Sequence, residues 1–459
     1  MRKSARNMAK ILACKFGGTS VTDAARILHI RNSIVRRNRR RRAIVVSAPA
    51  GVTNMLIEWV ESLIETSLPR KDFIMDAVRD RFVTMVQELG LSLNINTMFD
   101  EILAHCEFLG HSGRNEELYD FAVTRGEWVN AQIVAEVLGF EFVDAADFIR
   151  FTWWHGTFDM EATRRRAMQI GLAEKAQRGV VIPGFYGRGR GLFPWSSGRI
   201  QAFSRGGSDI TGAIVAVLVG ASVYENWTDV AGIFAADPRV VHNPRKNVMM
   251  TFRELRELTF MGFKVFHEDA VAFVRDANIP IHVRCTMTPD KAGTMIVSKI
   301  PAKMRRPVVT GVASQNGFSI VTLEKYGLND NIGVQGLVER VFTKAGVGVN
   351  TTSSIDSITV IVDTAAFKPE QNRVLEELKR FRADDIRIKD DIALVCTVGE
   401  GMRDRIGVSA AISGSLARSR INIELVLQGG SQINVILGVA AHNGPRAVRA
   451  VYNNKLLKK

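Results

Sequence analysis

Two glycine-containing turns combine glycine with a cationic side chain, which suits them to binding anions. The first, Lys15-Phe16-Gly17-Gly18-Thr19-Ser20, follows a strand-like run and precedes a helix-like segment. Glycine lets the backbone approach a phosphate, and a helix N-terminus presents free N–H groups. Lys15 can neutralise charge on a transferred phosphoryl group. The lysine precedes the glycines, so this is not a Walker motif. A tight turn that simply requires glycine is the alternative interpretation.

The second turn is Ser204-Arg205-Gly206-Gly207-Ser208-Asp209, which opens another predicted helix. Arg205 suits a bidentate grip on a carboxylate. Asp209 either favours the helix dipole as a first-turn acid or orients Lys15 or Mg²⁺. A third segment, Trp227–Arg239, leaves a strand and contains Asp-Pro-Arg, with a plain loop as its alternative. Together the three segments favour phosphate binding more than any one does.

Strand-like and helix-like segments alternate over residues 11–300, which predicts a mostly parallel sheet covered by helices on both faces. Ligands of such folds bind at the carboxyl ends of the strands. The predicted strands are Ile11–Phe16, Ala43–Ser47, Gly179–Gly184, Ser222–Trp227 and Ile279–Val283. The predicted helices are Asp23–Arg37, Asn54–Glu65, Lys71–Leu89, Glu116–Leu138, Glu161–Arg178, Ser208–Val219 and Phe252–Leu258.

The pattern changes after a linker-like segment around Pro301–Pro307. Two units of β-α-β-β-α order follow, which predicts a duplicated ferredoxin-like module. Their predicted strands are Ser319–Glu324, Gly348–Ser353, Ser357–Val362, Ile392–Val398, Asn422–Leu427 and Gln432–Val439. Helices are predicted over Gly336–Lys344, Glu370–Phe381 and Ala410–Arg418 and after Pro445. Neither unit carries a nucleophile constellation, so we expect ligand sensing or dimerisation.

Composition excludes several classes of protein. The 459 residues are 46% hydrophobic and 24% charged, which is typical of folded proteins of two to four domains. No stretch predicts a membrane span or a signal peptide. The four cysteines are far apart without metal spacing, so we expect reduced thiols in the cytoplasm. The net charge is +14, yet the densest cluster, Arg36–Arg42, lacks interleaved aromatic residues. A solvated helix end is favoured there over weak polyanion attraction, and no nucleic acid is expected.

Six separated motifs, in order and context, resemble those of monofunctional aspartate kinases, and the resemblance covers nearly the whole chain. These motifs are Lys15–Ser20, Ser47–Asn54, Arg125–Glu127, Arg205–Asp209, Trp227–Arg239 and Gly262–Val265. Gln428–Asn434 is also similar to that family's second ACT module. The resemblance implies an α/β amino-acid kinase fold over residues 1–304, followed by two ferredoxin-like βαββαβ ACT domains over 305–388 and 389–459.

The implied reaction converts ATP and L-aspartate to ADP and 4-phospho-L-aspartate, the entry to lysine, threonine and methionine synthesis through diaminopimelate. The implied ATP contacts are Lys15, Phe16, Gly17, Gly18, Thr228, Asp229, Phe234, Arg239 and Lys264. The implied aspartate contacts are Ser47, Thr53, Glu127 and Arg205, and the catalytic residues are Lys15, Asp209 and Lys264. Without the family context, a helix-surface acid is the favoured reading of Glu127. Mg²⁺ is expected with ATP rather than on a set of protein ligands.

The reaction needs charge compensation more than proton transfer. The substrate carboxylate has a pKa of about 3.9 and is already ionised at neutral pH, so it needs no general base. Lys15, Mg²⁺, the turn amides and Lys264 offset its repulsion from the γ-phosphate. For regulation, an amino-acid effector (lysine, threonine or methionine) and a homodimer or homotetramer through the ACT domains are expected. The expected effector contacts are Gly336, Leu337, Val338, Asn350 and Ser353.

Several departures from the family pattern leave alternatives open. Phe234 stands where Tyr is usual, Glu268 stands in place of Pro, and Asn350 replaces an Asp of lysine-sensitive members. The segment Ile200–Phe203 stands in place of a threonine-rich run, and an enlarged basic loop, Arg188 to Arg199, precedes it. A catalytically weakened, metabolite-binding regulatory homologue is therefore the alternative to an active kinase. A kinase of glutamate or carbamate is a third and less favoured reading.

Overall fold

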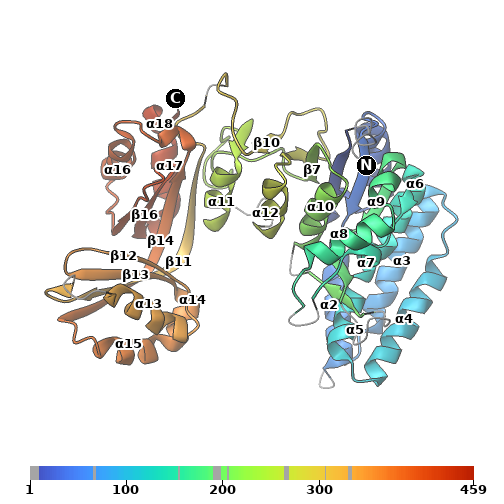
Figure 1. The fold of residues 1–459 in the computed structure, drawn as a ribbon, viewed down its shortest axis with the longest axis horizontal. Helices are drawn as coiled ribbons and strands as arrows, with labels where there is room; N and C mark the ends of the chain where they lie inside the picture. The colour runs from blue at the N-terminus through green and yellow to red at the C-terminus, as the bar shows by residue number, and fades with distance from the viewer. Residues whose placement is uncertain are drawn as a thin grey trace. The chain divides into compact units, whose positions relative to one another are not determined.

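The structure is a computed structural model that describes residues 10–65, 69–152, 156–189, 198–203, 206–262, 268–304, 306–328 and 333–458. The chain forms two compact units (Figure 1). Unit 1 comprises Met1–Ile233, Asn247–Phe252 and Val265–Ile300. Unit 2 comprises Phe234–Lys246, Arg253–Lys264 and Pro301–Lys459. Within the described ranges, no helix has the length and apolar character needed to cross a membrane.

An eight-stranded sheet forms the centre of unit 1. Its strand order is β3 (Glu141–Phe142), β4 (Val180–Pro183), β2 (Arg41–Val46), β1 (Leu12–Phe16), β7 (Val223–Thr228), β9 (Ile281–Cys285), β10 (Thr294–Val297) and β8 (Met249–Thr251). Neighbouring strands are parallel except for β9 with β10. The predicted mostly parallel sheet is confirmed. The strands that the sequence did not predict are short or lie at the sheet edges.

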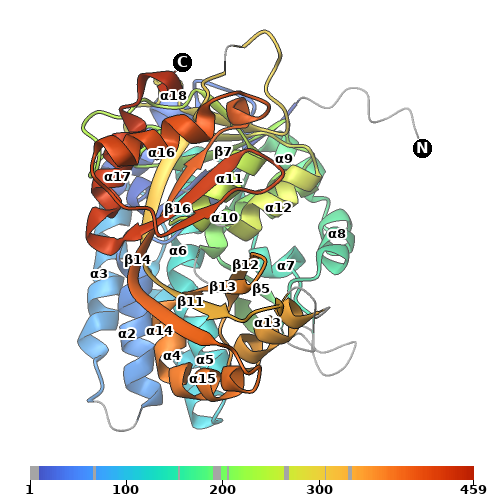
Figure 2. The same cartoon turned by 90° about the vertical axis from the view of Figure 1, so that its left-hand side faces the viewer.

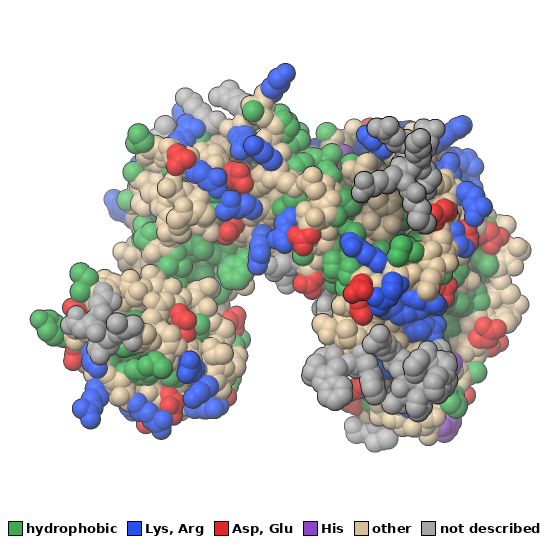
Figure 3. Space-filling model, in the orientation of Figure 1, with side chains coloured by type: hydrophobic (Ala, Val, Ile, Leu, Met, Phe, Trp, Pro, Cys, Tyr) green, Lys and Arg blue, Asp and Glu red, His purple; other side chains and the backbone are tan. Residues whose placement is uncertain are grey.

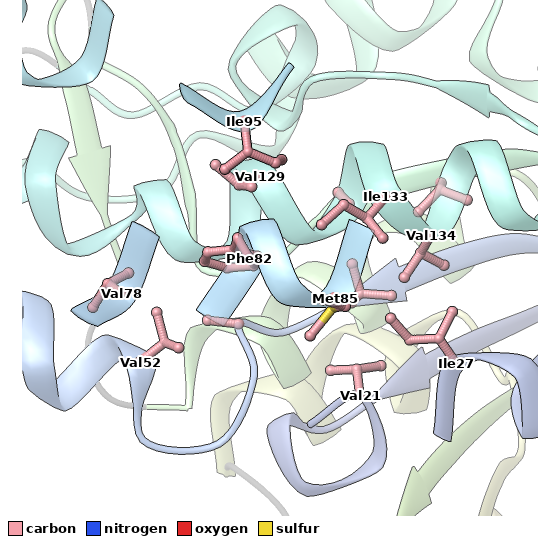
Figure 4. Packing of buried hydrophobic residues seen from close by; sticks show 14 of the residues in the cluster. Val21, Ile27, Val52, Val78, Phe82, Met85, Ile95, Val129, Ile133 and Val134 are labelled. Atoms are coloured by element: carbon pink, nitrogen blue, oxygen red, sulfur yellow. The ribbon is translucent and has the colours of Figure 1, made fainter. Parts of the chain in front are cut away.

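Helices of unit 1 pack on this sheet, with a short hairpin of β5 (Tyr186–Arg188) and β6 (Ile200–Ala202) beside it. The helices are α1 (Ala24–His29), α2 (Val52–Ile64), α3 (Asp72–Leu89), α4 (Ile95–His111), α5 (Asn115–Val123), α6 (Arg125–Leu138), α7 (Ala145–Phe148), α8 (Met160–Gln169), α9 (Leu172–Arg178), α10 (Gly207–Leu218) and α12 (Glu268–Asp276). A large hydrophobic core of the unit lies between the sheet and α1 to α6. Figure 4 shows Phe82 and Met85 of α3 packed against Val129 and Ile133 of α6. This packing fixes the position of α6.

Three helix predictions differ from the structure for local reasons. The predicted helix Glu116–Leu138 is two helices, α5 and α6. They are separated at Thr124, whose hydroxyl donates to the carbonyl oxygens of Asp120 and Phe121. The predicted helix Glu161–Arg178 is interrupted by Gly171, which has a φ of +65°. Helix α4 was not predicted, although Asn94 accepts a hydrogen bond from the Thr97 amide and so caps its N-terminus.

Unit 2 contains one continuous six-stranded sheet. Its strand order is β12 (Val349–Ser353), β13 (Ser357–Asp363), β11 (Gly311–Glu324), β14 (Asp385–Val398), β16 (Asn434–Ala440) and β15 (Leu425–Leu427). Its helices are α11 (Phe252–Phe260, all but its first residue), α13 (Val334–Lys344), α14 (Thr364–Phe367), α15 (Gln371–Lys379), α16 (Val408–Arg418), α17 (Gly444–Tyr452) and α18 (Lys455–Lys458). The β-α-β-β-α order is confirmed in both halves.

The two halves of unit 2 share strands that are longer than predicted. β11 and β14 pair from Gly311 opposite Val398 to Glu324 opposite Asp385, with register shifts between Gln315 and Phe318 and between Phe318 and Ile320 (Figure 2). The added parts of these strands contain polar and glycine residues, so they do not show the apolar run by which buried strands were recognised. Each half nevertheless keeps its own hydrophobic core, one under α13 and α15 and the other under α16 and α17.

A buried carboxylate joins the central strands of unit 1. Glu225 of β7, which is 3% exposed, accepts hydrogen bonds from Arg41 of β2 at 2.7 and 3.0 Å. Arg284 of β9 approaches it at 3.4 Å, and the Trp227 indole N–H and the Cys14 thiol also donate to it. Arg41 is therefore not part of a solvated helix end, which corrects the interpretation of the Arg36–Arg42 cluster at this position. The two guanidinium groups hold the pKa of Glu225 below its usual value against the opposing effect of burial.

We predict that Glu225→Ala lowers the free energy of unfolding by about 3–5 kcal/mol, because it leaves Arg41 and Arg284 buried without their carboxylate. Urea denaturation at pH 7 measures the loss. Glu161→Ala is the matched control, because Glu161 pairs with Arg165 at the surface of α8 and should cost less than about 1 kcal/mol. Equal losses in the two variants would show that the buried cluster does not hold the sheet together.

Candidate active site

The side chains of successive β1 residues point alternately to the two faces of the sheet. Cys14 and Phe16 point into the core with α1 and α6, and Phe16 stacks on Trp227 with ring centroids 5.9 Å apart. Lys15 points to the opposite face, where α10 begins. This alternation follows from the two-residue period of a strand. The apolar residues of β1 therefore anchor the strand, and the single lysine between them is free to serve a site.

Lys15 is held by an ion pair at the carboxyl end of the sheet. Its Nζ lies 2.7 Å from Oδ1 of Asp209 in the first turn of α10, and both side chains are largely buried. The Asn226 amide, from the β7 residue paired with Lys15, donates to the same oxygen at 3.4 Å. Asp209 thus contacts Lys15, which agrees with the prediction that it orients this lysine. This ion pair holds the Lys15 ammonium group near the turn that follows β1.

The Lys15–Ser20 turn presents unoccupied backbone N–H groups beside this lysine. The Gly17 amide donates to the Trp227 carbonyl at 3.1 Å, whereas the amides of Gly18 and Thr19 have no acceptor among the described residues. A Cβ on Gly18 would lie 2.7 Å from the carbonyl oxygen of Ala48, so only glycine allows this close approach. A 3-10 turn over Gly18–Ser20 follows, and α1 begins only at Ala24. Turn amides, rather than the N-terminus of α1, are therefore available to an anion.

Glu127 lies in a second group of polar side chains close to this turn. It is 3% exposed in the first turn of α6, so the reading as a helix-surface acid is wrong. Thr53 of α2 donates to its Oε1 at 3.3 Å, and the Ala48 amide also stabilises the carboxylate. Its other oxygen, Oε2, is buried without a hydrogen-bond partner among the described residues. An unpaired carboxylate oxygen of this kind suits an incoming ammonium group.

Burial raises the pKa of Glu127 to about 7, against the smaller lowering effects of the Ala48 amide, its own amide, Thr53 and Arg125. At neutral pH the carboxyl group is therefore close to half ionised. A cationic ligand would favour the ionised form, so ligand binding and deprotonation of Glu127 are coupled. Strongly shifted carboxyl groups of this kind are concentrated at functional sites.

Backbone hydrogen bonds connect the two groups. The Ser47 amide donates to the Phe16 carbonyl at 3.1 Å, and the Ala50 amide donates to the Gly18 carbonyl at 3.1 Å. The Asn130 side chain of α6 holds the Ser47 carbonyl at 2.7 Å. The loop carrying Ser47 and the turn carrying Gly18 thus meet at one edge of the sheet. The structure brings Lys15, Gly17, Gly18, Ser47, Thr53, Glu127 and Asp209 to this edge.

The remaining predicted residues are distributed differently. Arg205 and Lys264 lie outside the described residues, as does most of the predicted basic loop; Gly206 just before α10 has a φ of +87°, which favours glycine. Thr228 and Asp229 lie at the end of β7 in unit 1, where the Thr228 hydroxyl donates to the Asp229 carboxylate at 3.0 Å. Phe234 and Arg239 belong to unit 2, and the 90% exposed side chain of Arg239 pairs with Asp237 at 2.7 Å.

The predicted effector residues lie on two adjacent elements of unit 2. Gly336, Leu337 and Val338 are on α13, and Asn350 and Ser353 are on β12. Val338 is fully buried in the core, so only its backbone could contact a ligand. Gln335 and Glu339 of α13 both bond to the Thr351 hydroxyl of β12 beside them. These side chains define the polar part of the surface between the helix and the strand.

Two residues that position the site were not predicted. Asn130 holds the Ser47 loop, and Asn226 contacts Asp209. Both are amides flanked by apolar residues in α6 and β7, and this was the signal available in the sequence. For metal binding, the described residues contain no cluster of three or more His, Cys, Asp or Glu side chains.

Comparisons with known proteins agree with this arrangement. The amino acid kinase family matches residues 10–285, and an ACT domain family matches residues 395–454. Aspartokinase 3 of Bacillus subtilis is 31% identical over 458 residues, which cover 95% of this chain and 97% of that protein. The relationship therefore extends over both units.

Solved structures are similar over the same range. The aspartate kinase of Clostridium acetobutylicum has a TM-score of 0.83 and 32% identity, covering 97% of this chain and all of that one. Aspartokinase III of Escherichia coli, at 25% identity over 97% of this chain and 99% of that one, has TM-scores of 0.78 with aspartate and ADP bound (R-state) and 0.74 with lysine and aspartate bound (T-state).

We predict that Glu127→Gln removes a pH-dependent loss of stability. The raised pKa of Glu127 means that its stabilising contribution is present below about pH 4 and is lost as the pH rises through about 7. Between pH 5.5 and pH 8, the wild type should lose about 1–2 kcal/mol more free energy of unfolding than the variant. Urea denaturation of both proteins at both pH values measures this. An identical change in the two proteins would contradict a raised pKa at Glu127.

Proposed function

The chain belongs to the amino acid kinase family and, within it, to the aspartokinases, and we propose how its own residues perform the aspartokinase reaction. The protein uses ATP to phosphorylate the side-chain carboxylate of L-aspartate, giving ADP and 4-phospho-L-aspartate, under allosteric control by amino acids. The observation that best supports the proposed roles is the Lys15–Asp209 pair beside the free amides of Gly18 and Thr19, with Glu127 across the adjoining loop.

Lys15 carries the positive charge needed for phosphoryl transfer. The ATP phosphates would lie against the amides of the Gly17–Gly18 turn, with Lys15 neutralising the transferred group. Asp209 positions Lys15 through their ion pair. Because the substrate carboxylate is ionised, the reaction consists of bringing two anions together in line, which positioning and charge compensation accomplish. Phe16 would take part only through its backbone, because its ring is fully buried against Trp227.

Glu127 supplies recognition of the aspartate ammonium group. Its buried, unpaired Oε2 would accept a hydrogen bond from that group, with Thr53 holding the other oxygen. Ser47 lies on the same edge, and we propose that Arg205 pairs with the α-carboxylate. With its ammonium group bound by Glu127 and its α-carboxylate by Arg205, the amino acid is held in one orientation, and its side chain is directed to the phosphate.

Further nucleotide contacts are proposed for Thr228, Asp229, Phe234, Arg239 and Lys264, with Lys264 also acting on the transferred group. Mg²⁺ would be held mainly by the nucleotide phosphates, since Mg²⁺ commonly keeps only one or two protein carboxylates as ligands. The carboxylates of Asp209, in the first turn of α10, and of Asp229, just after β7, fit that limited requirement. When bound, the ion neutralises charge on the phosphates, and Lys15 retains its own role.

Regulation is proposed to reside in residues 305–388 and 389–459 as two ACT domains, with residues 1–304 as the kinase domain. Because aspartokinase III of E. coli has been solved with lysine, we propose an amino-acid effector between α13 and β12. Lysine, threonine and methionine are the candidates. A homodimer or homotetramer through the ACT domains is proposed. The four cysteines are free and buried, which fits our proposal of a reducing cytoplasm.

We predict that Lys15→Ala lowers kcat by about 10²–10³-fold, because one preorganised positive group is lost from the developing charge. Trapping the acyl phosphate as a hydroxamate, together with ADP release, measures turnover. Lys71→Ala is the matched control, since that lysine pairs with Glu58 on the surface far along the chain from the site. Unchanged turnover in a folded Lys15→Ala protein would remove this lysine from the mechanism.

Arg205→Ala should raise the KM for aspartate by about tenfold to a hundredfold, because a charge-assisted hydrogen bond to the α-carboxylate is lost. The KM for ATP should change little. Steady-state kinetics with each substrate varied separately provide the measurement. If the variant affects only the ATP requirement, Arg205 belongs to the nucleotide site instead.

A further inference from the structure

A pocket of about 560 Å³ lies in unit 1 among α4, α5, α6 and the β5–β6 hairpin. Its volume is in the range of small-molecule sites. None of the proposed aspartate or ATP contacts lines it. Arg125 and Trp128 of α6 face the pocket, whereas Glu127 of the same helix bonds to Thr53 of α2. The pocket is therefore reached from a different face of α6 from the proposed substrate site.

Arg125 is a buried cation without an acidic partner. It is 6% exposed, and it forms no ion pair with any carboxylate among the described residues. Its Nε donates to the Phe121 carbonyl at 3.1 Å and its Nη2 to the Thr124 hydroxyl at 3.0 Å, so only neutral acceptors are used. Because a guanidinium has five N–H donors, donors remain for a ligand.

Aromatic rings surround the guanidinium of Arg125. The ring centroids of Phe121, Tyr186 and Trp128 lie 4.4, 5.0 and 5.7 Å from its central carbon. Cation–π contacts offset only part of the cost of burying a charge. Glu127, the nearest acid along α6, is only partly ionised at neutral pH because burial raises its pKa. An anion in the pocket would provide the missing compensation.

A second arginine faces the same space. Arg188 of β5 is half-buried and donates to the carbonyl oxygens of Ala146 and Gly198, again without a carboxylate partner among the described residues. The other two lining arginines, Arg114 and Arg199, each pair with a glutamate of α5. Arg125 and Arg188 thus each lack a hydrogen-bonded carboxylate partner among the described residues. Three acids bear on this balance: Asp147 interacts electrostatically with Arg188, Asp144 lines the pocket but accepts from the Tyr186 hydroxyl, and Glu101 at the exposed rim would repel an anion. Figure 3 shows Lys and Arg side chains gathered over α7 and α8 on this unit, which attracts anions.

The rest of the pocket wall is apolar. Ile102 of α4, Phe121 of α5, Trp128 of α6 and Ile200 of β6 all line it. We propose that this pocket binds a small organic anion, whose carboxylate or phosphate pairs with Arg125 and Arg188 while an apolar or planar body lies against Phe121 and Trp128. This binding site is independent of the aspartokinase reaction, because it uses none of the residues assigned to it.

Isothermal titration calorimetry of the full chain, in the presence of saturating L-aspartate, tests the proposal. The probes are sodium phenylacetate and phenyl phosphate, which distinguish a carboxylate from a phosphate, and neutral 2-phenylacetamide as the matched uncharged control. At least one anion should bind at least tenfold more tightly than the amide. Arg125→Met and Arg188→Met should each weaken that anion at least tenfold. Arg178→Met, which removes a 79% exposed charge outside the pocket, should not.

The proposal is overturned if neither anion binds, if the amide binds equally well, or if both pocket variants bind like the wild type. It is also overturned if the anion binds only in a parallel titration without aspartate, since the probe would then occupy the substrate site. Should Arg125→Met fail to fold, Arg188→Met at its half-buried position provides the test alone. Because calorimetry measures binding and not turnover, a loss of kinase activity in either variant does not affect the result.

Discussion

The buried carboxylate of Glu225 is the constraint on which the architecture of unit 1 depends. Its partners come from β2, β1, β9 and β7 itself, so one charged group connects strands that are far apart in the sequence. The cluster also orders Trp227, whose ring stacks on Phe16 and whose carbonyl receives the Gly17 amide. Trp227 therefore holds the turn that follows β1 in two ways. Its carbonyl oxygen accepts from the Gly17 amide, and its ring stacks on Phe16.

The same strands supply the chemistry on their other face. The residues of β1 and β7 next to this cluster, Lys15 and Asn226, both meet Asp209. A shift of one residue in the register of β1 would exchange core and site side chains, so the buried cluster and the site specify one another. Helix α6 has a comparable double role, because its apolar face packs against α3 while its first turn carries Glu127 and Arg125.

The sequence predicted those features that depend on local patterns. The parallel sheet, the two glycine turns and the repeated β-α-β-β-α order follow from periodicity and turn residues, and the family resemblance added the roles of individual residues. Features that depend on tertiary partners were not predicted. The sequence groups Arg41 with the neighbouring arginines of a solvated helix end, because nothing near it in the sequence indicates that its guanidinium binds the Glu225 carboxylate. Similarly, the burial of Glu127 and the unpaired state of Arg125 arise from helices that are distant in sequence. The polar half of β11 is a strand because it pairs with the apolar half of β14, and the polar half of β14 pairs in turn with the apolar half of β11.

The long pairing of β11 with β14, interrupted only by two local register shifts, has a mechanical consequence for unit 2. Two modules joined by a flexible linker can rotate about it, but modules built on the same hydrogen-bonded strands cannot swing apart without breaking the ladder between them. A conformational change produced by a ligand at one module would therefore reach the other as an altered twist or bend of the paired strands β11 and β14. The register shift between Gln315 and Phe318 interrupts the hydrogen-bond ladder, so the strand pair should bend most easily there.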